Sequence, residues 1–261
     1  MIAAVALGFL AFGISLLTLF SGFGLGTLLM PAFALFLPVE VAVASTAIVH
    51  MANNLFKAGI LAGRVERSVV VRFGFPAVVA SFIGALLLTS LSGQAPLASW
   101  SFLGRPAHVT VVKLVMGLLI VGFALLELVP ALRSLRAPVR WLPVGGALSG
   151  FFGGLSGHQG ALRAAFLGPL ELSPAAFAST QAAIALLVDG ARLLVYGWSF
   201  VQLSNSSSAI PWRLVAMATV AAFAGSLFGK RLLPKVTHAG LHATVGVLLM
   251  VVGLALAAGA A

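Results

Sequence analysis

Long apolar stretches with almost no charge run through this chain from end to end. Hydrophobic residues make up 61% of its 261 residues and charged residues only 8%, whereas soluble domains carry about a quarter charged residues. Folded in water, such a chain would expose large apolar patches. In a bilayer, lipid solvates these surfaces, and only helices or closed barrels satisfy the backbone. Because the apolar runs are long and do not alternate, we expect membrane helices and not barrel strands.

Ten apolar segments are expected. They cover residues 2–20, 24–37, 40–61, 68–91, 108–129, 141–155, 159–171, 174–198, 211–230 and 237–258. The second, sixth and seventh are short, since a helix needs about 20 residues to cross a bilayer, and we expect them to be tilted, broken or re-entrant. The predicted fold class is therefore all-α, a polytopic membrane bundle of about ten segments.

Basic residues gather in the loops that follow the third, fifth and ninth segments. These loops hold Arg64, Arg67, Arg72, Arg133, Arg136, Arg140, Lys230, Arg231 and Lys235. The loops on the other side hold only Arg105, Lys113 and Arg213. Since cytoplasmic loops are enriched in Lys and Arg, this bias predicts that both termini lie outside. The same rule explains the net charge of +10 without a nucleic-acid partner.

The chain also repeats itself at offsets of 134 to 136 residues. The matching stretches are Ser21–Gly26 with Ser156–Gly160, Pro38 with Pro174, Ala44–Ala47 with Ala178–Gln181, and Lys57 with Arg192. Five segments per half is an odd number, so the halves must be inverted in the membrane, as in many alternating-access carriers. We predict an N-terminal repeat over residues 1–130, a basic cytoplasmic linker over 131–140 and a C-terminal repeat over 141–261.

Polar side chains interrupt two of the long segments. Segment three holds Thr46, His50, Asn53, Asn54 and Lys57. Segment eight holds Thr180, Gln181, Asp189 and Arg192. Such stripes face a protein interior or a water cavity, and two interpretations stay open: the stripes bind substrate, or they join neighbouring helices. Asp189 and Arg192, spaced i, i+3, form either an ion pair that holds the fold or part of a coupling site with Lys57.

Two glycine-rich breaks carry the candidate anion site. The first contains Gly24 and Gly26, and the second contains Gly157, His158, Gln159, Gly160 and Arg163. A broken helix exposes backbone N–H groups and a positive dipole end, both of which bind anions, and a guanidinium fork suits an oxyanion. We expect the anion near mid-membrane, between the breaks and the polar stripes. The alternative is glycine used for close packing, which we favour for residues 145–154.

Several kinds of site are absent from the sequence. There is no cysteine, so thiol catalysis and Cys-based metal sites are impossible. His238 and His242 are spaced i, i+4 without an evident third ligand, so we expect no metal. The chain has no GxSxG elbow, HExxH helix or Walker A loop. We therefore expect neither an enzyme nor a cofactor, and no ATP motor.

Two stretches resemble a known family. The first reads GFGLGTLLMPAF and LPVEVAVASTAIVHMANN over residues 22–54, and the second reads GGLSGHQGALRAAFL, LSPAAFASTQA and LLVDGARLLVYG over residues 153–197. Both resemble the TauE/SafE sulfite exporter family, the TSUP anion permeases. The resemblance implies a multi-pass permease of the inner (cytoplasmic) membrane for sulfite, organosulfonates or related small anions. This chain departs from the family at His158-Gln159 and Ala164-Ala165, which leaves the substrate open.

The leading interpretation is a secondary carrier that exports a small oxyanion. An anion channel, or a membrane-embedded enzyme or assembly factor, is the alternative. The expected partners are a small anionic substrate and the lipid bilayer, without nucleic acid, and a homodimer stays open.

Overall fold

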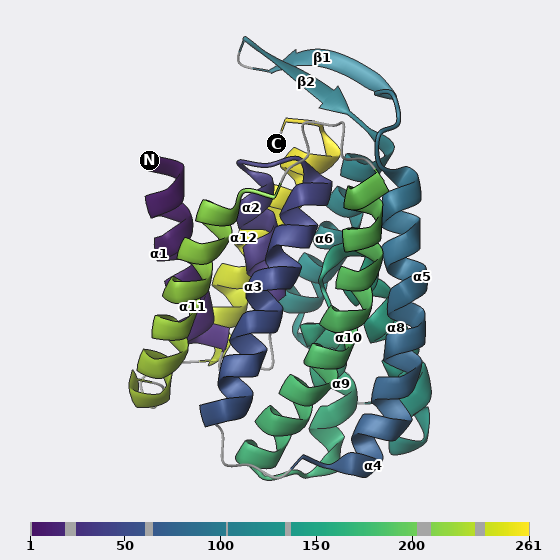
Figure 1. The fold of residues 1–261 in the computed structure, drawn as a ribbon, viewed down its shortest axis with the longest axis vertical. Coiled ribbons are helices and arrows are strands. Elements are labelled where there is room, and N and C mark those ends of the chain that lie inside the picture. Colours follow the sequence, from purple (N-terminus) through teal and green to yellow (C-terminus); the bar gives the residue numbers. More distant parts are fainter. Residues whose placement is uncertain are drawn as a thin grey trace.

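The computed structural model describes residues 2–18, 25–60, 65–102, 104–133, 137–202, 210–232 and 238–260. Helices fill almost all of it, and a β-hairpin lies at one end of the bundle (Figure 1). The first half contains α1 (Ile2–Thr18), α2 (Leu25–Ala34), α3 (Val39–Ile60), α4 (Arg67–Val69), a π-helical turn (Val70–Gly74), α5 (Phe75–Leu91), β1 (Ala98–Phe102), β2 (Arg105–Val109) and α6 (Val111–Leu128). The rest contains α7 (Pro130–Arg133), a 3-10 turn (Val139–Trp141), α8 (Leu142–Ser156), α9 (Gly160–Leu167), a 3-10 turn (Gly168–Leu170), α10 (Pro174–Gln202), α11 (Trp212–Leu232) and α12 (His238–Ala257).

The predicted membrane bundle is confirmed. Each of the ten expected segments contains one helix, with α4, the π turn and α5 forming a single run. Five helical runs in the described part of the chain are long and apolar enough to cross a membrane. They are Val39–Gly59, Arg67–Leu91, Val111–Leu128, Pro174–Ser199 and Trp212–Gly229. The three segments expected to be short are the helices α2, α8 and α9, with 10, 15 and 8 residues.

Two of the short helices belong to pairs that turn back inside the bundle. Helix α1 packs on α2, and α8 packs on α9. In Figure 1 the first pair leads into α3 at the upper end and the second leads into α10 at the lower end, while both chain termini lie at the upper end. The two breaks meet, because a Cβ built on Gly26 would lie 2.9 Å from the carbonyl oxygen of Gly157. The two helix pairs therefore turn back at the same depth in the bundle.

Three helix pairs pack with their backbones in contact: α5 on α8, α1 on α11, and α6 on α12. On α8, Gly146, Gly150 and Gly154 recur at every fourth residue; Gly146 faces the π turn, and the other two face α5. A Cβ on Gly150 would lie only 2.0 Å from the carbonyl oxygen of Ala77. Because no larger side chain fits at that distance, these glycines have the packing role that the sequence predicted for them.

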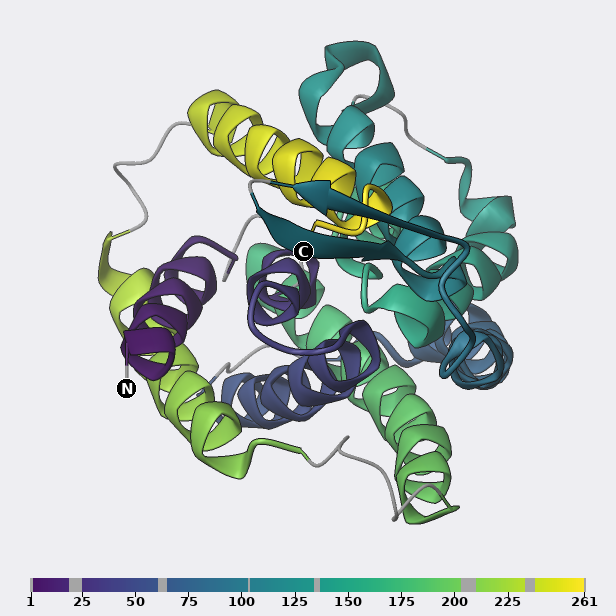
Figure 2. The same cartoon turned by 90° about the horizontal axis from the view of Figure 1, so that it is seen from above.

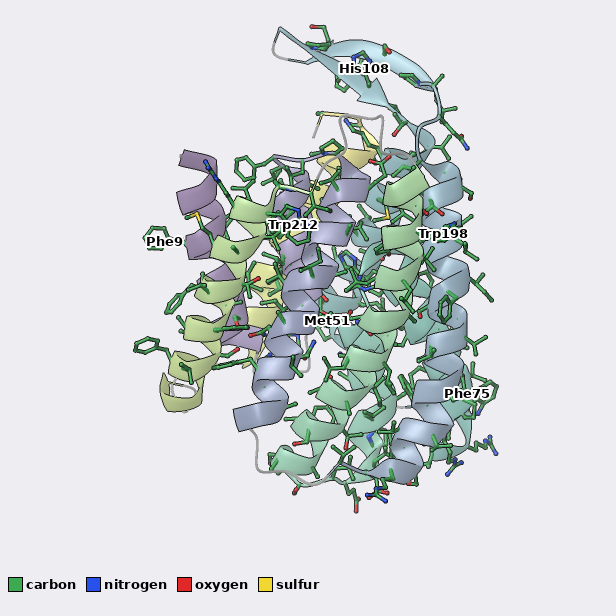
Figure 3. The ribbon with its side chains drawn as sticks, in the orientation of Figure 1. Phe9, Met51, Phe75, His108, Trp198 and Trp212 are labelled. Carbon is green, nitrogen blue, oxygen red and sulfur yellow. The ribbon has the colours of Figure 1, made fainter. Side chains whose placement is uncertain are left out.

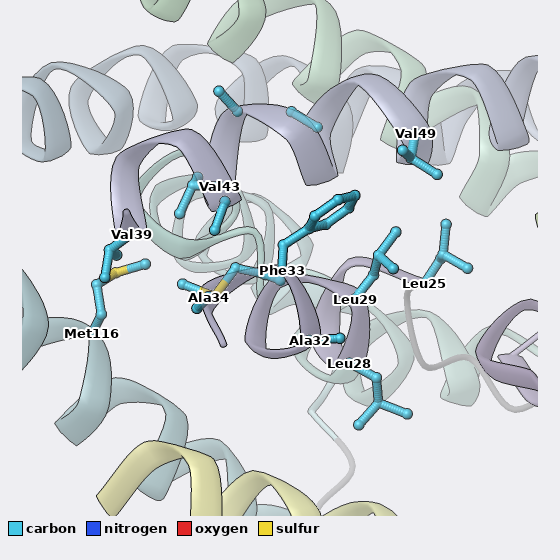
Figure 4. Close-up of a cluster of buried hydrophobic side chains, with 14 of the residues drawn as sticks. Leu25, Leu28, Leu29, Ala32, Phe33, Ala34, Val39, Val43, Val49 and Met116 are labelled. Carbon is cyan, nitrogen blue, oxygen red and sulfur yellow. The ribbon is translucent and has the colours of Figure 1, made fainter. Parts of the chain in front are cut away.

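Large apolar side chains lie on the exterior of the bundle as well as in its interior. Figure 4 shows the buried cluster in which Leu25, Leu29 and Phe33 of α2 face α3. On the outside, Phe9 and Phe75 point away from the bundle (Figure 3), with exposed fractions of 74% and 69%. Large apolar side chains on the surface are what a lipid-facing protein requires.

The hairpin of β1 and β2 was not predicted. The two strands pair antiparallel, and the hairpin lies across the C-terminal end of α12 (Figure 2). The indole of Trp100 donates to the carbonyl of Ala258 at 2.8 Å, and the amide of His108 donates to that of Gly259 at 3.2 Å. The expected start of segment five at residue 108 is wrong, because His108 pairs in the sheet and Thr110 caps α6 by accepting from the amide of Lys113.

Candidate functional site

The polar residues that the sequence singled out lie inside the bundle, on α3, on α10 and at the turn into α9. The buried side chains among them are Thr46, His50, Asn53, Asn54, Lys57, His158, Gln159, Arg163, Thr180, Gln181, Asp189 and Arg192. Gly26, Gly157 and Gly160 are buried with them, while Gly24 lies outside the described residues. We call this set the polar seam.

The carboxylate of Asp189 is the centre of the seam. Its Oδ1 accepts from Arg192 through Nη2 at 2.7 Å and Nε at 3.0 Å, and from Nε2 of Gln159 at 3.2 Å. Its Oδ2 lies 2.6 Å from Nδ1 of His50. The i, i+3 contact inferred from the sequence is therefore present. The carboxylate also contacts His50 of α3 and Gln159 of the second break, and the spacing within α10 did not predict these two contacts.

Arg163 forms a second cluster beside the first. Its Nε donates to Oε1 of Gln181 at 3.1 Å, and its Nη1 donates to Oε1 of Gln159 at 3.3 Å. Since Gln159 also donates to Asp189, this one amide joins the two clusters. Arg192 closes the network at the break, where its Nη1 donates to the carbonyl of Gly153 at 3.1 Å.

Glycine shapes the second break. Gly157 has φ +82°, in the left-handed region, and follows directly after the last residue of α8. That conformation favours glycine, and it lets the chain turn back into α9 at Gly160. The next side chain, His158, is buried with its ring stacked on Phe123 of α6, the centroids being 5.2 Å apart. The break thus places the N-terminus of α9 beside Gly26 and the seam.

Several buried polar atoms of the seam, and of residues on the same helices outside it, have no hydrogen-bond partner. They include Oγ1 of Thr27 and Thr46, Oγ of Ser45 and Ser179, Nδ2 of Asn53 and Nε2 of Gln181. Leaving a buried group unsatisfied costs about 1–3 kcal/mol. A gathering of such atoms around one network is therefore typical of a place that water or a ligand occupies.

Three of these residues were not among the predicted site residues. Ser45 and Ser179 belong to the matching stretches Ala44–Ala47 and Ala178–Gln181, which could have indicated them, whereas Thr27 is a lone hydroxyl in an apolar helix. Two residues assigned to the substrate make structural contacts. Oγ1 of Thr180 accepts from the amide of Glu66 at 2.9 Å, and Oδ1 of Asn53 accepts from the hydroxyl of Ser226 at 3.0 Å.

The histidines considered for a metal site were His238 and His242. His242 lies 2.8 Å from Glu127 of α6, and the side chain of His238 lies outside the described residues. Within the described part of the chain, no group of three or more His, Cys, Asp or Glu residues could hold a metal ion.

Comparison with known proteins places this geometry in a family. The family model for the sulfite exporter TauE/SafE matches residues 7–256. That match runs from within α1 to within α12 and includes every residue of the polar seam. No curated protein matches the chain. The chain therefore belongs to the TauE/SafE sulfite exporter family, a family of multi-pass membrane transporters.

Proposed function

We propose that this protein is a secondary carrier that exports a small sulfur oxyanion, sulfite or an organosulfonate, across the inner membrane. The observation that carries the proposal is the polar seam itself. It joins α3 of one half to α9 and α10 of the other through buried hydrogen bonds. Its buried basic side chains, Lys57, Arg163 and Arg192, outnumber its one buried carboxylate, Asp189. An excess of buried positive charge favours an anionic ligand.

The arrangement of the helices supports alternating access by two inverted repeats, residues 1–130 and 141–261. If α1, α2, α3, α5 and α6 correspond to α8, α9, α10, α11 and α12, several contacts occur twice. The contact of α5 with α8 corresponds to that of α11 with α1, and the contact of α5 with α10 corresponds to that of α11 with α3. The pairs α3–α10 and α6–α12 then lie on the symmetry axis.

The breaks supply the second argument for an anion. The helices α2 and α9 both begin at a break, and Gly26 near the start of α2 lies against Gly157. Two positive helix ends therefore converge beside the seam. We place the substrate there, within reach of Thr46, His50 and Arg163.

A carrier fits this structure better than a channel. The contact between His50 and Asp189 joins α3 directly to α10, and Arg163 is bonded to Gln181 of α10. Such contacts must break and re-form for an anion to pass, which is the behaviour of a carrier. A channel would instead need an open, hydrated path.

Proteoliposomes loaded with sulfite test the proposal. Arg163→Ala should abolish sulfite efflux, because it removes a charged donor from the seam, while Arg140→Ala on the exposed linker side should transport like the parent. Both variants should elute as the parent does in size-exclusion chromatography. If Arg163→Ala exports sulfite at the parent's rate, the polar seam is not the substrate site. Unsaturable efflux at a channel's rate would overturn the carrier mechanism.

A further inference from the structure

The ring of His50 lies between the buried carboxylate of the seam and the point where the two breaks meet. Its Nδ1 is 2.6 Å from Oδ2 of Asp189. The other edge of the ring faces the start of α2, because a Cβ built on Gly26 would lie 3.8 Å from Cδ2 of His50. The same Cβ would lie 2.9 Å from the carbonyl oxygen of Gly157. His50 therefore contacts the ion pair on one side and the proposed place of the substrate on the other.

The contact with Asp189 fixes which nitrogen of His50 can take up a proton. A carboxylate accepts only, and Oδ1 of Asp189 already accepts two bonds from Arg192. The hydrogen between Nδ1 and Oδ2 therefore belongs to His50, and in the neutral ring the lone pair lies on Nε2. Nε2 is 3.3 Å from Nδ2 of Asn54, whose shorter bond goes to the carbonyl of His50 at 2.9 Å. A further proton therefore binds at Nε2.

The charges in contact with one another decide when that proton binds. With a neutral ring, Asp189 and Arg192 form a balanced ion pair. Protonation of His50 places a second cation on the same carboxylate, and the exposed fractions of the three side chains are only 0–2%. A buried net charge is unfavourable unless a counter-charge lies beside it. An anion at the breaks supplies that counter-charge, so anion binding and proton binding strengthen each other equally.

The other ionisable groups near His50 come from its own helix and from the elements around it. They are Glu40 and Lys57 of α3, Asp189, Arg192 and Tyr196 of α10, His158 of the second break, Arg163 of α9, which is joined through Gln159, and exposed Arg213 of α11 with Lys230 and Arg231, whose side chains lie outside the described residues. Helix α2 carries none. Of all these groups, only His158 ordinarily titrates near neutral pH as His50 does.

We propose that His50 takes up one proton together with the anion, so that the protein carries a proton and its substrate across the membrane in the same direction. This inference rests on the proposed function and names its coupling ion. The proton comes from water on the side where the anion binds, is held on Nε2, and returns to water where the anion leaves. His50 and Asp189 belong to different halves of the chain, so their contact is one that alternating access would break and re-form.

Proteoliposomes loaded with methanesulfonate and a trapped pH-sensitive dye measure both flows. Methanesulfonate is a permanent monoanion and carries no proton itself. With the parent, its efflux should make the lumen more alkaline, and an imposed membrane potential should not change the rate, because a monoanion with one proton has no net charge. In detergent, calorimetry should show an affinity for methanesulfonate that falls by up to tenfold per pH unit as pH rises through about 6–8.

His50→Asn removes the titratable ring and keeps an amide N–H that can donate to Asp189. It should bind methanesulfonate with an affinity that does not depend on pH, and its transport should leave the pH of the lumen unchanged. His242→Asn is the matched control, since His242 also lies beside a buried carboxylate, Glu127, at 2.8 Å. It should behave as the parent does. His158→Asn should still move a proton with each anion, whatever its rate.

The outcomes separate this inference from the function beneath it. A parent that exports methanesulfonate without protons, or proton movement that survives His50→Asn, overturns the coupling and leaves the carrier intact. If His50→Asn fails to fold, His50→Gln replaces it. If neither binds the anion, proton movement that persists in His158→Asn supports His50, and its loss there overturns the inference.

The choice of anion does not limit the test. If the parent accepts only sulfite, the same comparison is made with sulfite, because its own protonation is the same for parent and variants. A parent that binds and transports neither anion overturns the proposed function itself.

Discussion

Replacing Asp189 by asparagine should destabilise the protein strongly. The carboxylate and Arg192 are both 0% exposed, and the carboxylate accepts two bonds from Arg192 and one from Gln159. Asn removes the charge and keeps one amide oxygen, so Arg192 is left with neutral acceptors only, that oxygen and the carbonyl of Gly153. Removing one partner of a buried ion pair costs about 3–5 kcal/mol. We expect a loss of about this size in the free energy of unfolding.

The double variant Asp189→Leu/Arg192→Leu provides the internal comparison. It removes both charges, so no cation is left buried alone, and replacing a buried pair by apolar side chains is often nearly neutral. We therefore expect it to lose less stability than Asp189→Asn, a non-additivity that a mutant cycle measures directly. Glu171→Gln, an exposed carboxylate, should be silent.

Reversible unfolding in mixed micelles, followed by tryptophan fluorescence, gives the free energy of unfolding of each of the three variants. The reasoning is refuted if Asp189→Asn unfolds like the parent. It is also refuted if the double variant loses more stability than the single one, because the pair would then stabilise the fold through its own attraction.

Three further outcomes are expected. Gly150→Leu should prevent α8 from packing on α5, since even a Cβ there would lie 2.0 Å from the carbonyl oxygen of Ala77. The control Gly122→Leu, at a position where a Cβ would meet nothing within 4 Å, should fold normally. Size-exclusion profiles distinguish the two variants. Trp100→Phe should lose the bond to Ala258 and about 1 kcal/mol of stability, seen as faster proteolysis of the hairpin, and unchanged proteolysis would contradict that contact. Reporter fusions should place both termini outside, and a cytoplasmic signal at either end would reverse the orientation drawn from the basic loops.

The helices were predictable because the requirement for apolar length in a bilayer is strict. A stretch such as 174–198 has one plausible structure, and α10 occupies it at Pro174–Gln202. The short helices were predictable for the same reason, since length alone excluded a full crossing. The hairpin was not predictable, because residues 98–109 mix small, aromatic and polar side chains without alternation. Its register depends on contacts with the end of α12.

The sequence predicted which helix faces carry the polar seam, but it did not predict which residues of other helices those faces contact. Spacing placed Thr46, His50 and Lys57 on one side of a helix, and the structure buries all three. Spacing says nothing about which neighbour covers that side. The contact of His50 with Asp189 joins residues 139 positions apart. The hydroxyl of Thr180 accepts from the amide of Glu66, and this contact depends on tertiary packing.

The glycine-lined helix pairs have a consequence for how the nascent chain matures. Ser15 of α1 donates to the carbonyl of Ala222 on α11, 207 positions later, and α5 finds its closest neighbour in α8. Helix α1 therefore cannot meet its partner until α11 has been synthesised. A fragment ending at residue 130 holds three helices, α1, α5 and α6, whose packing partners α11, α8 and α12 are encoded downstream. We therefore expect that residues 1–130 do not fold stably until residues 141–261 have been made.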